Sequence, residues 1–486
     1  MLFNSYFFIF IFLPLSVAGY FVLHHFTRPR YAQYLLLAMS FWFYAANDLR
    51  SVPVLLGSIL LNYLFSTAIS ATPYRRTKSI LLVCGIFLNL LALGIFKYMN
   101  FFMENIALLT GQSYDPIQLL LPLGISFFTF QQISYLVDTR RGTAPTYTLP
   151  EYALYASFFP YVTSGPIAFH SEILPQIQSR ANWAPSARNL SRGLTAFSFG
   201  LFKKVLVADT LGAAADWGWN HLNDLNIPAA ILVILAYSLQ LYFDFAGYSD
   251  MASGVALCFN IELPINFDSP YRARDISDFW KRWHMTMTRF FTQYVYIPLG
   301  GSRHGLARTC LNTLIIFLLS GLWHGAAWTF VLWGALHGIA MVICRVLKAH
   351  TKRHLPLFPA WLLTFLFVNL CWVFFRAPSI AAAGQLLSRT VMGGFGALPA
   401  DLTDCFMITE FSCLQQLLPF GKEAFATVVC IFFVLAALAG AVFPQNMQQR
   451  LKNFQPKPSL CAVATLLLFW SILSLSGVST FLYFTF

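Results

Sequence analysis

The sequence predicts an all-α polytopic membrane protein, and three observations support that class. Residues of the set AVILMFWYC make up 58% of the 486 residues, whereas charged residues make up only 10%. Soluble domains carry about 25% charged residues. The chain has 50 Phe, 21 Tyr and 12 Trp, which are more aromatic side chains than the core of one soluble domain could bury. Because the apolar residues also gather in long runs, we exclude a secreted, disordered or ordinary cytosolic protein.

The apolar runs follow one another along the whole chain. They lie near Tyr6–Leu23, Ala32–Ala46, Val52–Ser70, Ile80–Phe102, Ile117–Val137, Tyr152–Ala168, Leu194–Ala215, Ala229–Phe245, Leu311–Trp323, Ala326–Val346, Trp361–Phe375, Ala424–Phe443 and Leu460–Phe481. A spanning helix needs about 20 residues, so several short runs are expected to be broken or re-entrant. We expect about eleven transmembrane helices together with re-entrant or interfacial helices.

The first run is predicted to be a retained span, because no Lys or Arg precedes it and no small-residue cleavage site follows it. No Gly/Ser linker, composition shift or internal repeat divides the chain. We therefore expect residues 1–486 to form one domain.

Basic residues in the loops predict the orientation. They follow the first, third and fifth runs as Arg28, Arg30, Arg75, Arg76, Lys78, Arg140 and Arg141. The positive-inside rule places these loops in the cytoplasm and the N-terminus outside. The last run follows Arg450, Lys452 and Lys457, so the C-terminus is also expected outside. The tail Phe481–Phe486 would then lie at the outer membrane boundary or in a cavity that opens there.

The net charge of +12 does not indicate nucleic-acid binding. The Lys and Arg residues lie mostly in short breaks between apolar runs, where anionic lipid headgroups account for them. The nine Cys show no CxxC or metal-ligand spacing and are interpreted as soft packing residues. Cys405 and Cys413 share a loop and would be able to pair if that loop faces an oxidising compartment.

Three regions combine polar residues with apolar surroundings. In the first, Tyr242–Asp250, two carboxylates continue an apolar run. Asp244 and Asp250 are costly at membrane depth unless paired or solvated. They either anchor an arginine in a fixed re-entrant loop or belong to a functional polar network. The candidate anchors are Arg272, Arg274 and Arg282.

The second region, Asn266–Gly301, is amphipathic and too charged to span. Its residues Phe279, Trp280 and Trp283 suggest a helix with one side in the membrane interface. His284 follows directly. Taken alone, such a histidine is most often a packed or interfacial residue.

The third region, Ser320–Gly338, holds His324 between Gly321 and Gly325. These glycines would let a backbone or a ligand approach the imidazole. His337 lies 13 positions on, about 220° around a continuous helix, so the two histidines are expected to face different sides. Neither has a metal-ligand partner at i,i+4 spacing, and no metal site is expected. A buried imidazole with space beside it suits general base catalysis.

These regions, together with Phe158–Ile167, resemble the membrane-bound O-acyltransferase family. The resemblance is strongest to its bacterial branch, which holds the membrane subunits for alginate and peptidoglycan O-acetylation and the teichoic-acid D-alanyl transferase. It implies a bundle of roughly eleven spans around a central tunnel, with His324 as the invariant catalytic histidine and His284 as the second active-site position. Further candidates for the tunnel or its polar network are Asp244, Asp250, Arg282, Trp283 and Trp323.

The tail F-L-Y-F-T-F resembles the aromatic C-terminal motif of envelope acylation systems. That resemblance implies that Tyr483 accepts the acyl group. The alternative is that Tyr483 is an aromatic residue of the interfacial belt.

The function implied by the resemblance is relay O-acetylation of a cell-envelope or extracellular polysaccharide, such as peptidoglycan or an alginate-like polymer, at a bacterial cytoplasmic (inner) membrane. The donor would be a cytoplasmic thioester, acetyl-CoA, with no permanently bound cofactor. The expected partner is an extracytoplasmic SGNH-type esterase-like protein. Two alternatives are D-alanyl transfer from a carrier protein and, remotely, a proton-coupled transporter that uses His324 and Asp244.

Overall fold

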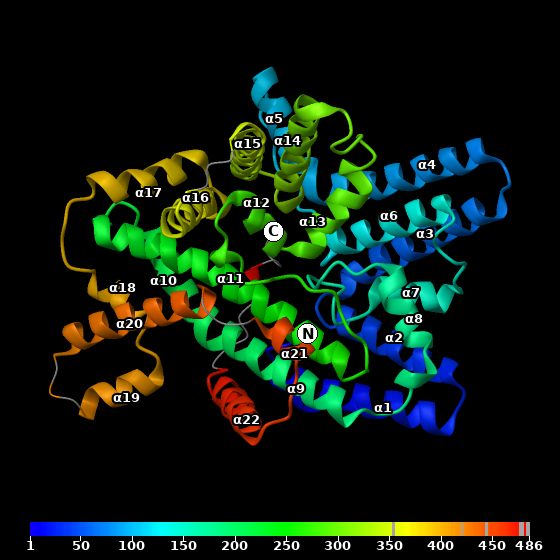
Figure 1. The fold of residues 1–486 in the computed structure, drawn as a ribbon, viewed down its shortest axis with the longest axis horizontal. Helices are drawn as coiled ribbons and strands as arrows, with labels where there is room; N and C mark the ends of the chain where they lie inside the picture. Colours follow the sequence, from blue (N-terminus) through cyan, green and yellow to red (C-terminus); the bar gives the residue numbers. More distant parts are fainter. Residues whose placement is uncertain (352–354, 418, 420, 443–445, 476–480, 483–486) are drawn as a thin grey trace.

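The computed structural model describes residues 1–351, 355–417, 419, 421–442, 446–475 and 481–482. Among these residues the regular secondary structure is helical, without a strand. The long helix α11 (Ile227–Leu257) runs through the middle of the molecule, with the early helices α1 to α4 on one side and α16 to α20 on the other (Figure 1). The arrangement agrees with the predicted all-α class.

Eight helical segments of the described chain are long and apolar enough to cross a membrane. They are Phe8–Phe26, which contains α1 (Leu13–Phe26); Leu49–Ala71, which contains α3 (Val52–Ala71); Arg75–Thr110, which contains α4 (Arg75–Leu93) and α5 (Met99–Thr110); α11; α14 (Gly305–His324); α15 (Trp328–His350); α16 (Leu357–Arg376); and α20 (Lys422–Val442). The polytopic prediction is thereby confirmed, with eight such helices where about eleven spans were expected.

The other α-helices are shorter or more polar. They are α2 (Pro29–Ala45), α6 (Ile125–Arg141), α7 (Leu149–Ser157), α8 (His170–Gln178), α9 (Ala187–Phe202), α10 (Asp209–Asn220), α12 (Ile276–Arg282), α13 (Met285–Phe291), α17 (Ile380–Met392), α18 (Ala400–Asp404), α19 (Thr409–Leu417), α21 (Met447–Lys452) and α22 (Pro458–Leu473). Beside α18 and within α19, Cys405 and Cys413 are both free thiols.

Two of the predicted spans are interrupted by proline and glycine. The run Ile117–Val137 is non-helical as far as Gly124, where α6 begins, because Pro122 and the left-handed Gly124 break it. A Cβ on Gly124 would lie 2.2 Å from the carbonyl oxygen of Val162, so only glycine fits. The run Tyr152–Ala168 likewise becomes α7 and a buried non-helical segment. Helix α6 and the run Tyr152–Ala168 are mostly buried in the protein interior, whereas Ile117, Leu119 and Leu120 before α6 are exposed.

Helix α9 packs against α11 through glycines. A Cβ on Gly193 would lie 2.6 Å from the carbonyl oxygen of Gly254, and a Cβ on Gly200 would lie 2.6 Å from that of Gly247. Small residues let helix backbones touch, which is how membrane helices gain close packing. The close contact brings the residues that follow Gly200 against the middle of α11.

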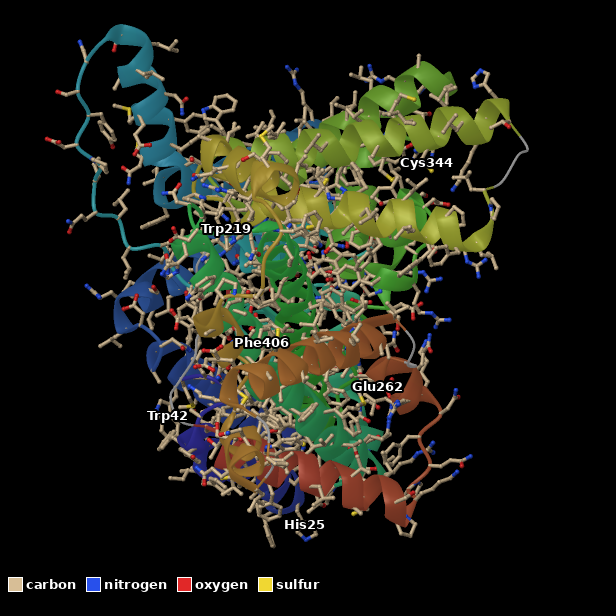
Figure 2. The ribbon with its side chains drawn as sticks, turned by 90° about the vertical axis from the view of Figure 1, so that its left-hand side faces the viewer. His25, Trp42, Trp219, Glu262, Cys344 and Phe406 are labelled. Atoms are coloured by element: carbon tan, nitrogen blue, oxygen red, sulfur yellow. The ribbon has the colours of Figure 1, made fainter. Side chains whose placement is uncertain are left out.

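Helices α14, α15 and α16 lie side by side (Figure 2). The first two touch through Gly321 and Gly334, because a Cβ on either would lie 2.4 Å from a carbonyl oxygen of the facing helix. The short connection between α14 and α15 contains Gly325, and a Cβ there would collide with the ring of Phe330. The glycines beside His324 therefore admit protein backbone and an aromatic ring.

Candidate active site

His324 is the last residue of α14, and only 3% of its surface is exposed. Its ring is enclosed edge-on by three aromatic rings, with centroid distances of 4.8 Å to Trp323, 5.1 Å to Trp333 and 5.2 Å to Phe375. This surrounding excludes bulk water from the imidazole. A histidine in such a place is neutral unless another group supplies charge.

The end of α14 is held by two residues of one π-helical turn, Gly94–Tyr98, between α4 and α5. The Lys97 ammonium donates to the carbonyl oxygens of Trp323 at 2.7 Å and His324 at 3.0 Å. The Tyr98 hydroxyl donates to the carbonyl oxygen of Leu322 at 2.6 Å. Three carbonyls that the helix leaves without an intrahelical donor are thus satisfied, and the backbone of His324 is fixed.

Sequence reasoning missed Lys97, although a signal was present. A lysine inside the apolar run Ile80–Phe102 is costly unless it has a buried partner, and such residues mark functional or structural polar sites. Its partner is a backbone 227 residues away, which no local pattern indicates.

We expect Lys97→Met to lower acyl transfer about tenfold or more, because hydrogen bonds from a charged donor contribute about 1.5–3 kcal/mol and these two orient the residue that ends α14. Transfer rate and thermal stability of the solubilised protein are the measurements. Lys348→Met is the matched control, since Lys348 forms a half-exposed ion pair with Asp275. Full transfer by a well-folded Lys97→Met variant would contradict this role.

His284 lies between α12 and α13 and is completely buried. Its backbone is left-handed, with φ 43° and ψ 53°, one of three such non-glycine residues in the described chain. This conformation is unfavourable for a residue with a Cβ and is typical of functional sites. It turns the chain so that the imidazole enters the core while α13 departs in a new direction.

Asn266 orients the His284 ring. The side-chain oxygen of Asn266 accepts hydrogen bonds from the Thr286 hydroxyl at 2.9 Å and from His284 Nδ1 at 3.0 Å. This assignment places the proton of His284 on Nδ1 and the lone pair on Nε2. Burial lowers the pKa of His284 to about 3, so the imidazole is neutral at physiological pH.

The structure brings His284 and His324 together. Their ring centroids are 6.4 Å apart, and Trp323 borders both, at 6.0 Å from His284 and 4.8 Å from His324. The pair has the burial, proximity and polar support of an acid–base site.

His337 is close to this pair, contrary to the expectation that it faces another side. The expectation assumed one continuous helix, but the chain breaks between α14 and α15. Trp333 lies against both histidines, at 5.1 Å from His324 and 5.0 Å from His337. His337 Nδ1 accepts a hydrogen bond from Trp280 Nε1 at 3.2 Å, which gives it a structural role in the aromatic core.

The two carboxylates of the first polar region lie within α11, which corrects the expected re-entrant loop. Their partners are also different from the arginines expected. Lys203 and Lys204, in the π-helical turn between α9 and α10, donate at 2.7 Å to Asp250 and Asp244 respectively. The glycine contacts of α9 with α11 place these lysines opposite the carboxylates, so tertiary packing selected the partners.

The remaining candidates take structural positions. Arg282 donates at 2.8 Å to Asp278 and contacts Asp268 at the edge of the site. Trp283 is completely buried among aromatic rings, and Phe279 and Trp280 are almost completely buried. This burial corrects the expectation that their helix lies in the membrane interface. Trp323 is a wall of the histidine site. Tyr483 lies outside the described residues.

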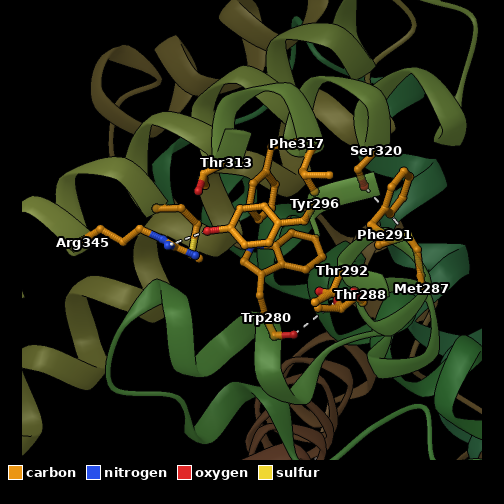
Figure 3. Close-up of a pocket in the computed structure, with 12 residues that line it drawn as sticks. Trp280, Met287, Thr288, Phe291, Thr292, Tyr296, Thr313, Phe317, Ser320 and Arg345 are labelled. Carbon is orange, nitrogen blue, oxygen red and sulfur yellow. Dashed lines mark hydrogen bonds between the residues drawn. The ribbon is translucent and has the colours of Figure 1, made fainter. Parts of the chain in front are cut away.

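A cavity of about 190 Å³ lies between α12, α13, α14 and α15 (Figure 3). Met287 and Ser320 line one end, three residues after His284 and four before His324. Arg345 and Tyr296 line the other, where the guanidinium donates to the tyrosine hydroxyl at 3.1 Å. The apolar cavity therefore extends from one basic side chain to within one helical turn of each histidine.

The fold is that of a multi-pass membrane protein with two adjacent buried imidazoles in its core. A family model described as the membrane-bound O-acyltransferase family matches residues 81–384. The chain belongs to this family, and it is an acyltransferase.

Curated relatives agree with this assignment. A peptidoglycan O-acetyltransferase of Helicobacter pylori is 43% identical, over 80% of this chain and 80% of its own. A probable alginate O-acetylase of Pseudomonas syringae pv. tomato is 37% identical, over 87% and 82% respectively. A teichoic acid D-alanyltransferase of Streptococcus thermophilus is 31% identical, over 46% and 56%.

Proposed function

We propose that this chain moves acetyl groups from a cytoplasmic thioester, acetyl-CoA, toward O-acetylation of a cell-envelope or extracellular polysaccharide. The observation that carries the proposal is the pair of buried histidines, each within one helical turn of a residue that lines an apolar cavity, Met287 or Ser320, with Arg345 at the other end of that cavity. The relatives that align with most of this chain are named as acetylating enzymes of peptidoglycan and alginate. The polymer is therefore peptidoglycan or an alginate-like polysaccharide.

The cavity is the route proposed for the donor. The end of the cavity that Arg345 lines lies beside the π-helical turn Thr292–Tyr296. Two arginines contact aromatic rings of this turn: Arg345 lies over Tyr296, and Arg141 lies over Tyr294. Arg141 is the last residue of α6, at the end of the run that the positive-inside rule assigns to the cytoplasmic side. A thioester donor entering here would meet guanidinium groups suited to phosphate, and its narrow arm would follow the apolar wall inward.

Chemistry at the histidines then transfers the acyl group. His324 removes the proton of the acceptor hydroxyl, which attacks the thioester carbonyl; a C–O ester bond forms, the C–S bond breaks, and the proton passes to the leaving thiolate. His284 holds a lone pair at Nε2 and stabilises the imidazolium that His324 becomes. Positioned general base catalysis contributes about 10²–10⁴-fold. Alignment of both reactants in a narrow cavity adds to it.

The acceptor in this scheme is Tyr483, and an extracytoplasmic SGNH-type partner moves the acetyl group onto the polymer. A phenol ionises with a pKa of about 10, so its ester is a better acyl donor than a sugar ester. The scheme places both termini outside a bacterial cytoplasmic membrane.

The proposal is tested with the purified full-length protein in liposomes. We expect ¹⁴C-acetyl-CoA to label the chain, and to label polysaccharide when the partner is added. A carrier protein charged with ¹⁴C-D-alanine should give no label, since the D-alanyltransferase of Streptococcus thermophilus aligns with less than half of this chain. If the chain is labelled by the charged carrier protein and not by acetyl-CoA, the proposed reaction is wrong and the chain transfers D-alanine.

A further inference from the structure

The ion pair between Asp244 and Lys204 is buried in the centre of the molecule. The two side chains are 2% and 3% exposed, and their charged atoms lie 2.7 Å apart. Lys204 also contacts Asp209 at 2.8 Å. Buried charges are costly unless every charged group has a bonding partner, and such residues often mark functional sites. The further contacts of this pair therefore indicate what the pair does.

The pair contacts the C-terminal tail through both of its members. The backbone N–H of Leu482 donates to the second oxygen of Asp244 at 3.0 Å. The Lys204 ammonium lies 4.8 Å from the ring centroid of Phe481, a cation–π contact. Tyr248, one turn along α11 from Asp244, meets the same ring edge-on at 4.7 Å.

These contacts hold Phe481 inside the protein. Its side chain is 1% exposed, although Leu475, six residues earlier and two residues beyond the end of α22, accepts a hydrogen bond from the exposed Tyr6 hydroxyl. Figure 1 shows the short red segment of the described tail beside α11. Phe481 and Leu482 therefore lie against the middle of α11.

The point of contact adjoins the histidine site. Phe245, which follows Asp244 in α11, meets the His284 ring edge-on at 4.8 Å. Two consecutive residues of α11 thus contact the tail and the site: Asp244 contacts the tail, and Phe245 contacts His284.

We propose that Asp244 and Lys204 form a receptor for the C-terminal tail and position the residue that follows Leu482, Tyr483, for acyl transfer. The inference rests on the proposed function of Tyr483 as the acyl carrier. Both residues act as positioning residues: the carboxylate sets the backbone of Leu482, and the ammonium holds Phe481 against α11.

The test removes the pair together, so that neither of these two buried charges is left alone; Asp209, which loses its contact with Lys204, is 29% exposed. The variant is Asp244→Leu/Lys204→Met in the full-length chain. Its matched control is Asp250→Leu/Lys203→Met, which removes the neighbouring ion pair of the same two helices. Size-exclusion chromatography selects folded protein, and hydrogen–deuterium exchange then follows the C-terminal peptide that contains the Leu482 amide.

We expect exchange of that peptide to become at least tenfold faster in Asp244→Leu/Lys204→Met and to stay slow in the control. Acetylation of Tyr483, read by mass spectrometry, should fall at least tenfold with the faster exchange. Unchanged exchange, or equal acceleration in both double variants, would overturn the proposal that Asp244 and Lys204 hold the tail. Faster exchange with undiminished acetylation would overturn its positioning role.

The outcome is separable from that of the proposed function. If Tyr483→Phe still transfers acetyl groups, Tyr483 is not the carrier, while the exchange result reports independently whether Asp244 and Lys204 hold the tail.

Discussion

Replacing His324 with alanine is expected to lower polymer acetylation by about a hundredfold or more while the protein inserts and folds normally. In the proposed mechanism the imidazole contributes general base catalysis, which is worth about 10²–10⁴-fold, and its loss removes that whole factor. The fold should persist because the ring is one member of a wide aromatic cluster, and the backbone bonds from Lys97 do not depend on the side chain. The measurement is acetyl transfer from labelled acetyl-CoA, normalised to folded protein.

His337→Gln is the control for this experiment. His337 is as deeply buried and shares Trp333 with His324, but its Nδ1 accepts from Trp280, a role that a glutamine oxygen can take over. We expect His337→Gln to retain most activity, and we expect His284→Ala, like His324→Ala, to impair acetyl transfer. Robust acetylation by a well-inserted His324→Ala variant would remove His324 from the mechanism.

Tyr483→Phe is expected to abolish transfer to the polymer while leaving a folded, inserted protein. The substitution deletes only the hydroxyl oxygen that would carry the ester, and an aromatic ring remains at the position. Wild-type protein incubated with acetyl-CoA should gain the mass of one acetyl group on its C-terminal peptide. Tyr483→Phe and His324→Ala should both lack it.

The matched control for this variant is Phe484→Tyr, which leaves Tyr483 in place and adds a second hydroxyl next to it. It should be acetylated at Tyr483 as in the wild type. If Tyr483→Phe instead acetylates polymer at the wild-type rate, Tyr483 is an interfacial anchor and the acyl group passes directly to the partner protein.

Much of the fold was predictable because hydropathy along a chain is a local property. Runs such as Ala326–Val346 and Trp361–Phe375 coincide with α15 and α16. The run Tyr152–Ala168 did not become a spanning helix, since its composition is equally suited to a protein interior and its Pro and Gly residues end α7. Hydropathy measures transfer out of water and does not distinguish lipid from protein as the destination.

The same limit explains the error at Phe279, Trp280 and Trp283. Their spacing describes an apolar helical side, and such a side is as well satisfied by an aromatic core as by a membrane interface. The turn at His284 then folds this short helix inward. A left-handed backbone at a histidine has no sequence signal comparable to that of glycine, so the turn was not predictable.

The sequence by itself determined the class of this protein and singled out His324 and the carboxylates of α11, because polar groups are rare at membrane depth and each is conspicuous there; His284 was singled out by the resemblance to the family. Only the tertiary structure decided what those groups touch. Lys97 meets the end of α14 across 227 residues, Lys204 meets Asp244 across 40, and Asp244 meets the tail across 238. Such partners are selected by how glycine-lined helices cross, and the energy of that packing is spread over contacts that no local pattern records.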